Sequence, residues 1–347
     1  MPRKILVLCL MLIALLALSL PGLSEKNTIL LKAATVKPAD STEAIVLSTF
    51  KELVEKRTQG TIRIEVYTDG ALGNDEQLIG GLHRGTVDLA TCAAFKYGGY
   101  VPEFMTLELP FLFFSIDHLR QILNGTLGEV LAEQAQKSRG DTVLGYITGN
   151  PVNVISSKTI PDLSRSQSLR FRMMLLPTHR QIWERLGMLP VTLAYSELRI
   201  GLQVGLVDLA ETSFSEFRQM RLYETAKYIL QTEHYFPVSP LLLSNLAWDK
   251  IPQAYRALLR DCAQEAIDDG TVYMNLNNSE VARDLTGKYW VRVSEFSFAD
   301  KKACRLKVAE EHQRVFSGFG LEKVWAEINS TFDLYEPLPE PEEELKP

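Results

Sequence analysis

A ten-residue segment that occurs twice, 120 residues apart, constrains the fold of this chain more than any other feature. The copies are Gly81-Leu-His-Arg-Gly-Thr-Val-Asp-Leu-Ala90 and Gly201-Leu-Gln-Val-Gly-Leu-Val-Asp-Leu-Ala210, and seven of their ten positions are identical. Each copy is typical of a helix end, a glycine that turns the chain through a positive φ, and a short strand. The repeat therefore predicts two α/β domains of similar construction, with a cleft between them.

The residues before the first copy alternate between strand and helix patterns. Residues 29–36 are mostly apolar, and residues 62–67 alternate as a half-buried strand does. Between them, the spacing of Asp40 and Glu43 predicts a capping box at the start of a helical pattern that Gly60 ends. A strand-helix-strand unit implies a parallel sheet with helices on its faces.

Residues that directly follow the two copies are candidate binding residues. Ligands of open parallel sheets bind at the carboxyl ends of the strands. Thr91 follows the first copy, and Glu211 and Thr212 follow the second. The alternative is that each copy is only a recurrent turn with no ligand nearby, and the sequence leaves both interpretations open.

The N-terminus has the pattern of a secretory signal peptide. Arg3 and Lys4 precede an apolar run at 5–20, and small residues at 22–24 provide a cleavage site. This run is shorter than the roughly 20 residues that a bilayer-spanning helix needs. We therefore expect residues 1–24 to be removed and the protein to be exported to the periplasm. The alternative is a retained signal that anchors the protein in the inner membrane.

The charge of the chain argues against nucleic acid as a main partner. The formal net charge is −6, from 37 Lys and Arg against 43 Asp and Glu. Phosphate binding requires a concentration of basic residues that this balance does not provide. Residues 336–347 are rich in Pro and Glu and lack an apolar face, so we expect a disordered acidic tail.

Three cysteines follow the predicted signal peptide, and none has the spacing of a metal site. Cys92 lies in an apolar strand pattern, which indicates a small buried side chain. Cys262 and Cys304 are left as candidates for a disulfide bond in an oxidising compartment.

No strong catalytic motif occurs in the sequence. The nucleophile elbow G-x-S-x-G, the zinc motif H-E-x-x-H and glycine-rich phosphate loops are absent, and the five histidines are scattered. The sequence therefore predicts no catalytic residues, no metal site and no cofactor. A binding protein is favoured over an enzyme.

Two breaks in the pattern suggest where the chain crosses between domains. Gly149-Asn-Pro151 separates two β-rich runs, and a second break lies near Pro237. The predicted first domain comprises 28–149 and about 238–277, and the predicted second domain comprises 150–237 and about 278–335.

Segments spread over residues 30–332 resemble one known family. Those of the first half are Phe50-Lys-Glu-Leu-Val-Glu-Lys-Arg-Thr-Gln-Gly60, Leu72-Gly-Asn-Asp-Glu76, Gly85-Thr-Val-Asp88 and Leu109-Pro-Phe-Leu-Phe113. Those of the second half are Pro161-Asp-Leu163, Leu169-Arg-Phe-Arg-Met173, Ser196-Glu197 and Gly205-Leu-Val-Asp-Leu-Ala-Glu211. In order and spacing they are similar to the solute-binding proteins of tripartite ATP-independent periplasmic (TRAP) transporters, of the dicarboxylate-binding-protein (DctP) type.

This resemblance implies both a fold and a function. The fold is the α/β periplasmic-binding-protein fold, in which two α/β domains surround a central ligand cleft and are joined by crossing hinge segments. The protein would close on an organic carboxylate and deliver it to the permease subunits in the membrane, without a cofactor. A helical-repeat (tetratricopeptide-type) periplasmic partner accompanies some members of the family.

The resemblance also implies a carboxylate-binding arginine, which falls on Arg172. A planar guanidinium makes two parallel charge-assisted bonds to a carboxylate and fixes its orientation. Arg170 would point to the same face of the strand, but Arg172 lies nearer its carboxyl end, where a cleft is expected.

Departures from the family pattern bear on the ligand. Thr212 stands where the family commonly has Asn, and Asn153 replaces a second Arg, whereas the aromatic residue Tyr195 is retained. Because the site loses charge and hydrogen-bonding capacity, we expect a monocarboxylate with an apolar body, resting on Tyr195 and on Tyr235 or Phe236. Arg172 and Thr212 would belong to the second domain's wall, with Tyr235 on the first domain's wall.

Alternatives remain at this point. The aromatic residues can instead belong to the core, with Thr91 or Lys96 replacing the missing polar groups. The protein can also be a ligand-binding component of a sensor, or an exported enzyme on the same fold.

Overall fold

The structure is a computed structural model that describes residues 28–335 except 161–162, 164–166 and 174–175. The predicted signal peptide and the predicted acidic tail lie outside the described residues. Among those that are described, none of the helices combines the length and the apolar character needed to cross a membrane.

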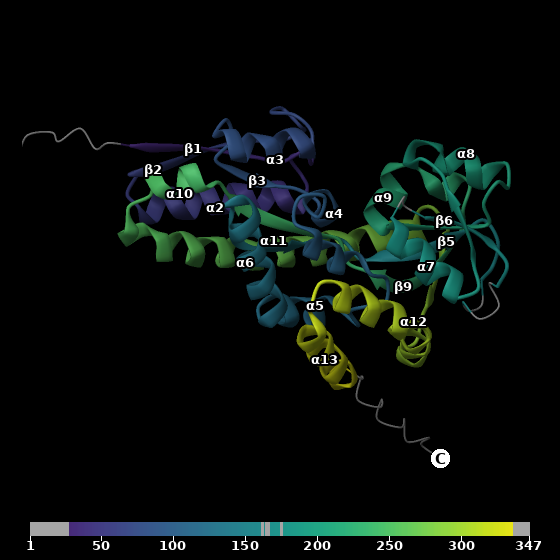
Figure 1. Cartoon of the computed structure of the whole chain (residues 1–347). Coiled ribbons are helices and arrows are strands. Elements are labelled where there is room, and N and C mark those ends of the chain that lie inside the picture. Colours follow the sequence, from purple (N-terminus) through teal and green to yellow (C-terminus); the bar gives the residue numbers. More distant parts are fainter. Residues whose placement is uncertain (1–27, 161–162, 164–166, 174–175, 336–347) are drawn as a thin grey trace, which may run out of the picture.

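Two mixed β-sheets organise the molecule (Figure 1). The first has the order β2-β1-β3-β10-β4 and the second the order β11-β9-β5-β8-β6-β7. The strands of the first sheet are β1 Ile29–Ala34, β2 Ile62–Tyr67, β3 Leu89–Thr91, β4 Thr142–Thr148 and β10 Val238–Leu243. Those of the second are β5 Val152–Ser156, β6 Arg170–Met173, β7 Leu189–Thr192, β8 Leu209–Ser213, β9 Tyr228–Tyr235 and β11 Arg292–Glu295. The predicted fold class is confirmed, and we call the parts built on these sheets the first and second domains.

Helices cover both sheets. The helices before the first crossing are α2 Thr42–Arg57, α3 Asp75–Arg84, α4 Ala94–Tyr97, the 3₁₀ helix η1 Pro102–Glu108, α5 Ile116–Leu123 and α6 Thr126–Arg139. The later ones are α7 Pro177–Arg185, η3 Tyr195–Glu197, α8 Leu198–Gln203, α9 Phe214–Gln219, η4 Leu222–Glu224, α10 Asn245–Lys250, α11 Gln253–Gly287, α12 Phe298–Gly318, α13 Glu322–Thr331 and η5 Phe332–Tyr335.

The chain passes between the sheets at two adjacent places. It leaves the first sheet after β4 and enters the second at β5, and it returns between β9 and β10. The N–H of Gly149 donates to the carbonyl of Pro237 at 2.7 Å, so the crossing segments lie side by side. The strands that flank them, β5 and β10, run antiparallel to their neighbours.

Helix α11 is a third connection between the domains. It has 35 residues and is therefore about 50 Å long. It packs against α2 and β4 of the first domain and against α9 of the second, and Figure 1 shows it running from one domain to the other.

The two copies of the sequence repeat adopt the same turn. Gly85 and Gly205 have φ values of 71° and 70°, in the left-handed region that glycine favours. The N–H of the next residue donates to the carbonyl of Gly81 at 3.0 Å in the first copy and of Gly201 at 2.8 Å in the second. The predicted equivalence of the copies is confirmed.

An aspartate in each copy fastens the turn to the neighbouring strand. The Asp88 carboxylate accepts a hydrogen bond from the N–H of Lys32 on β1 at 2.9 Å. The Asp208 carboxylate accepts one from the N–H of Arg170 on β6 at 3.1 Å. Each aspartate thereby satisfies a backbone donor of the adjacent parallel strand.

Replacing Asp88 with alanine should therefore destabilise the first domain. The change leaves the N–H of Lys32 without its acceptor beside a buried position, which costs about 1 to 3 kcal/mol. Asp88→Asn retains an acceptor oxygen and should lose less. Urea unfolding of the two variants measures the difference, and equal unfolding midpoints would contradict this role of Asp88.

The C-terminal helices contact both domains. Helix α12 packs against α7 of the second domain, and α13 lies against α5 of the first, where His118 Nε2 is 3.1 Å from the hydroxyl of Thr331. Strand β11 belongs to the second sheet. Residues 278–335, assigned by the sequence pattern to the second domain, thus touch both.

The cysteine pattern does not produce a disulfide bond in the described residues. All three cysteines there are free and buried. Cys262 packs in the core around β1 and α2, whereas Cys304 packs in a separate core beside α7. The suggested pairing of Cys262 with Cys304 is therefore wrong, because the two side chains belong to different cores.

Candidate ligand site between the domains

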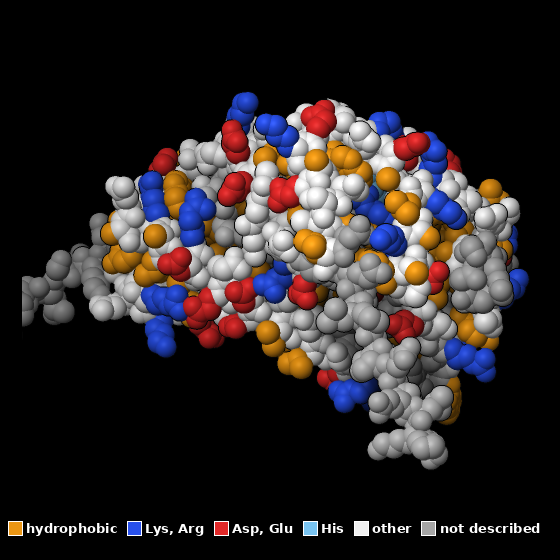
Figure 2. Space-filling view, turned by 90° about the horizontal axis from the view of Figure 1, so that it is seen from below, with side chains coloured by type: hydrophobic (Ala, Val, Ile, Leu, Met, Phe, Trp, Pro, Cys, Tyr) orange, Lys and Arg blue, Asp and Glu red, His pale blue; other side chains and the backbone are white. Residues whose placement is uncertain are grey.

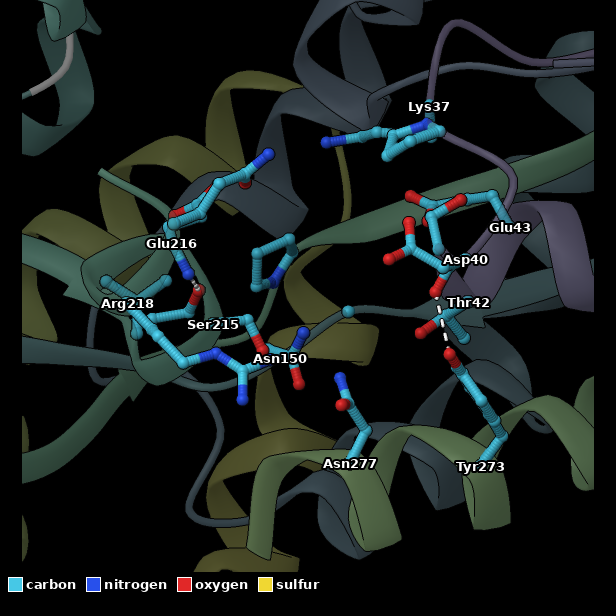
Figure 3. Close-up of a pocket in the computed structure, with 17 residues that line it drawn as sticks. Lys37, Asp40, Thr42, Glu43, Asn150, Ser215, Glu216, Arg218, Tyr273 and Asn277 are labelled. Atoms are coloured by element: carbon cyan, nitrogen blue, oxygen red, sulfur yellow. Dashed lines mark hydrogen bonds between the residues drawn. The ribbon is translucent and has the colours of Figure 1, made fainter. Parts of the chain in front are cut away.

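A cavity of about 400 Å³ separates the two domains beside the crossing segments, and we call it the interdomain hollow (Figure 3). Lys37, Asp40 and Glu43 face Glu216 and Arg218 across it, with Tyr273 and Asn277 of α11 at its base. The complete lining is Lys37, Pro38, Asp40, Ser41, Thr42, Glu43, Gly149, Asn150, Val152, Ser213, Ser215, Glu216, Arg218, Gln219, Pro237, Tyr273 and Asn277. Most of these side chains are polar or charged.

A smaller cavity of about 190 Å³ adjoins the hollow on the first domain's side. It shares Lys37 and Glu43 with the hollow and reaches Thr35 and Thr91 at the carboxyl ends of β1 and β3. Thr91 is buried, and its hydroxyl has no hydrogen-bond partner in the described structure. An unsatisfied buried hydroxyl in a cavity wall suits contact with a polar ligand.

Arg172 lies at the carboxyl half of β6, where the sequence places it. The residue is buried, its Nε donates to the carbonyl of Leu193 at 3.1 Å, and its guanidinium stands 5.5 Å from the centre of the Tyr195 ring. Burial lowers the pKa of Arg172, while Glu211, Tyr195 and Glu216 oppose that shift. The surroundings thus hold a desolvated cation in one orientation.

Glu216 connects Arg172 to the hollow. It lies in the first turn of α9, lines the hollow, and accepts a hydrogen bond from the Thr212 hydroxyl at 3.3 Å. Burial raises the pKa of Tyr195, and Glu216 adds to the increase. Arg172, Tyr195, Thr212 and Glu216 therefore form one polar group on the second domain's wall.

The second sheet separates the predicted site residues into two sets. Arg172 is in register with Ala210, and Asn153 is in register with Thr212, so these side chains share one face. Glu211 alternates with them and lies on the opposite face. Sequence adjacency had suggested one site for Glu211 and Thr212, and the pleat of the strand assigns them to different surroundings.

Glu211 is surrounded by two buried histidines. Its carboxylate is 3.6 Å from His179 Nδ1 and 3.3 Å from His234 Nε2. Burial alone would raise the pKa of Glu211, but His179 and His234 together hold it well below its usual range. Burial also opposes protonation of His179, but Glu211 and Glu108 outweigh this effect and raise the pKa of His179. For His234 burial prevails and lowers the pKa. Glu211 therefore favours the protonated form of His179.

Glu108 and Tyr235 join the two domains beside this cluster. The Tyr235 hydroxyl, at the end of β9, donates to the carboxylate of Glu108, in η1 of the first domain, at 2.5 Å. Burial raises the pKa of Glu108 to about 7, although Tyr235 and His179 oppose the increase. Sequence reasoning missed Glu108, and the available signal was a lone acidic residue between two leucines.

Other predicted ligand contacts have structural partners. The side chain of Asn153 accepts a hydrogen bond from the N–H of Glu233 at 3.0 Å. Glu233 has a positive φ of 43° and lies where the pairing of β9 with β5 is irregular, so this bond supports the bulge. Tyr235 belongs to the second sheet and not to the first domain's wall, because β9 carries it up to the crossing. Phe236 is buried in the core. Ligand contact by Asn153 and Tyr235 stays a prediction.

Glu108→Gln should remove a pH dependence of stability. Since the pKa of Glu108 rises from 4.5 to about 7 on folding, the folded state binds more protons in that interval and stability falls as the pH rises through it. Gln cannot ionise, so the variant should gain up to about 3 kcal/mol relative to the parent between pH 4.5 and 8. Unfolding in urea at pH 5 and 8 measures this gain. Glu103→Gln in the same short helix is the control, and parallel pH profiles for Glu108→Gln and the parent protein would contradict the prediction.

Comparisons with known proteins agree with this arrangement. A family model described as "Bacterial extracellular solute-binding protein, family 7" matches residues 33–318. The C4-dicarboxylate-binding periplasmic protein DctP of Rhodobacter capsulatus is 25% identical over 315 residues, which cover 90% of this chain and 93% of that protein.

Solved structures of TRAP periplasmic solute-binding proteins have the same fold. One from Ochrobactrum anthropi matches with a TM-score of 0.83 at 22% identity, covering 89% of this chain and 99% of its own. One from a Polaromonas species, bound to D-erythronate, matches with a TM-score of 0.72 at 27% identity, covering 87% and 98%.

Proposed function

Because the chain belongs to the DctP family, family 7 of the bacterial extracellular solute-binding proteins that serve TRAP transporters, we propose that it binds an organic monocarboxylate between its domains. Family membership confirms the predicted class of non-enzymatic transport proteins, and the periplasmic relatives agree with the predicted export.

The observation that carries the proposal is the buried guanidinium of Arg172 at the carboxyl end of β6. A buried cation is costly unless it is paired, and a carboxylate accepts two parallel hydrogen bonds from the planar guanidinium. The Tyr195 ring and the Leu193 carbonyl orient it. Glu216 places this group next to the hollow, which has room for a small organic acid.

The lining of the hollow bears on the rest of the ligand. Hydroxyl, amide and charged side chains predominate, among them Thr42, Asn150, Ser215 and Asn277. Such a lining favours a ligand with a hydroxylated body. The sequence had suggested an apolar body, because Asn153 and Thr212 stand where the family has Arg and Asn. The Polaromonas relative, which is bound to D-erythronate, supports a sugar acid. We therefore propose a hydroxylated monocarboxylate, with the apolar monocarboxylate as the alternative.

Closure would bring both walls onto the ligand. Arg172 and Thr212 belong to strands of the second sheet, whereas Lys37 and Thr91 line the cavities from the first domain, so only a closed form would contact the ligand from both sides. A ligand stabilises the state in which it makes more contacts. The permease subunits would then release it by favouring the open form. A helical-repeat periplasmic partner stays a prediction, which co-purification of a stable complex would test. A sensory role also stays a prediction, and neighbouring genes for permease subunits would favour transport over it.

Native mass spectrometry of the purified protein, followed by thermal-shift screening of carboxylic acids, tests the proposed function. A ligand at one hundred times its Kd stabilises the folded state by about 2.7 kcal/mol, which a thermal shift detects readily. We expect hits among hydroxylated monocarboxylates. Hits confined to apolar acids would select the alternative, and hits confined to dicarboxylates, or turnover of a bound acid, would overturn the proposal.

A further inference from the structure

The wall that carries Arg172 also carries an acidic side chain of its own. We propose that Glu216 is a specificity-determining residue that admits ligands with one carboxylate and rejects those with two. This inference rests on the proposed function, since it concerns the same site. Glu216 is not among the residues that the family resemblance identified, and its proposed role is to select ligands by their charge.

Glu216 is held in place by local contacts. Its N–H donates to the Ser213 hydroxyl at 3.2 Å, and its carboxylate accepts from the Thr212 hydroxyl at 3.3 Å. It is half-buried and lines the hollow. The first contact fixes the backbone of Glu216 at the start of α9, and the second points its carboxylate toward Thr212.

Two acidic side chains act on Arg172 through their charge, Glu211 more strongly than Glu216. Glu211 also lies near Arg172, but it is on the other face of the sheet, where His179 and His234 surround it. Glu216 is on the side of the hollow. A ligand carboxylate that reaches Arg172 from the hollow would therefore also approach the negative charge of Glu216.

A second carboxylate would find no equivalent cation. Arg218 lines the hollow but is paired with Asp284, with Nη1 3.5 Å from Oδ2. Lys37 stands on the opposite wall together with Asp40 and Glu43. Because the lining already carries more acidic than free basic groups, a second negative charge is repelled.

The same carboxylate suits hydroxyl groups. An ionised glutamate only accepts hydrogen bonds, and each hydroxyl of a sugar acid donates one. Glu216 would therefore replace its bond from Thr212 by one from the ligand, at the end of the hollow next to Arg172. The residue that repels a second carboxylate would thus also bind the hydroxylated part of the ligand.

Matched pairs of acids test this role. D-Erythronate and meso-tartrate differ only in that a carboxylate replaces the terminal hydroxymethyl group, and D-gluconate and D-glucarate differ in the same way. Isothermal titration measures Kd for all four with the parent protein and with Glu216→Gln, which keeps the shape and the acceptor oxygen. We expect the parent to prefer the monocarboxylate of at least one pair, and Glu216→Gln to reduce that preference by about tenfold or more.

The control is Glu224→Gln, which removes the same charge from the second domain away from the hollow, where Glu224 pairs with Arg199 and Arg221. It should leave the preference unchanged, and the thermal unfolding of all three proteins should be similar. A preference that persists in Glu216→Gln overturns the role of Glu216 while leaving the proposed function intact. Absence of binding to all four acids in both proteins overturns the inference together with the proposal of a hydroxylated acid.

Discussion

Arg172→Ala should weaken binding of the carboxylate ligand by about 2 to 5 kcal/mol, or roughly 30-fold to several thousand-fold in Kd. Arg172 is buried, and its guanidinium is oriented by the Leu193 carbonyl and the Tyr195 ring. Its removal would leave the ligand's carboxylate desolvated without a partner. Isothermal titration with the acid found by screening measures the loss.

Arg170→Ala is the matched control, because it removes the same side chain from the same strand. Arg170 is exposed and pairs with Asp208, with Nε 2.9 Å from Oδ2, at the end of β6 remote from Met173. Its loss should leave ligand affinity unchanged. Equal affinities for Arg172→Ala and the parent would contradict the assignment of Arg172 as the carboxylate-binding residue. Arg172→Lys should recover only part of the binding, because Lys cannot make two parallel hydrogen bonds to one carboxylate.

Glu211→Ala should destabilise the second domain by about 3 to 5 kcal/mol, because it removes the carboxylate that two buried histidines approach. Glu211 lies within 3.6 Å of His179 and 3.3 Å of His234, and all three side chains are buried. Urea unfolding near pH 6 measures the loss. Glu224→Gln, a partly exposed acid of the same domain, should leave the unfolding midpoint unchanged.

The loss should also depend on pH in a defined direction. Because folding lowers the pKa of Glu211, this residue stabilises the folded state at pH values above the usual glutamate pKa of about 4.3. That stabilisation is lost as the pH falls through the lowered pKa. The raised pKa of His179 gives stability that is complete below about pH 6.5 and is lost as the pH rises through the raised value. The pair therefore contributes most between roughly pH 4.5 and 6.5. A cost of Glu211→Ala that is as large at pH 9 as at pH 6 would contradict this pairing.

Several features of the fold follow from local sequence because their causes are local. The positive φ at Gly85 and Gly205, the short strands after them and the aspartates that bond to the next strand all arise within the repeated segment. A turn that needs glycine and a strand of buried residues can be recognised without knowing what surrounds them. Arg172 could likewise be selected, because the resemblance aligns a strand that carries it.

Other features depended on contacts between distant residues. Glu108 and Tyr235 are 127 residues apart and meet across the domains, and His179 approaches Glu211 from a different element. Nothing in the local sequence of either partner specifies the other. The pairing suggested for Cys262 failed for the same reason, since two helices place the thiols in different cores.

Mixed charge is a further property in which composition and structure agree. On the face shown in Figure 2, Lys and Arg side chains lie among Asp and Glu and among isolated hydrophobic side chains. This distribution fits the small net charge, which had argued against nucleic acid. Composition limits the class of partner in this way, but it does not locate a site.

The sequence by itself determined two α/β domains, the repeated turn, the family and the arginine expected to bind the ligand, because each depends on residues close together in the chain or on their order along it. Only the tertiary structure decided which side of the second sheet each candidate faces. Successive side chains of β8 point to opposite faces, so Thr212 stands with Arg172 and Glu216 while Glu211 joins the buried histidines. The physical reason is that the strand pleat fixes alternation, whereas the packing of helices and neighbouring strands fixes what each face meets.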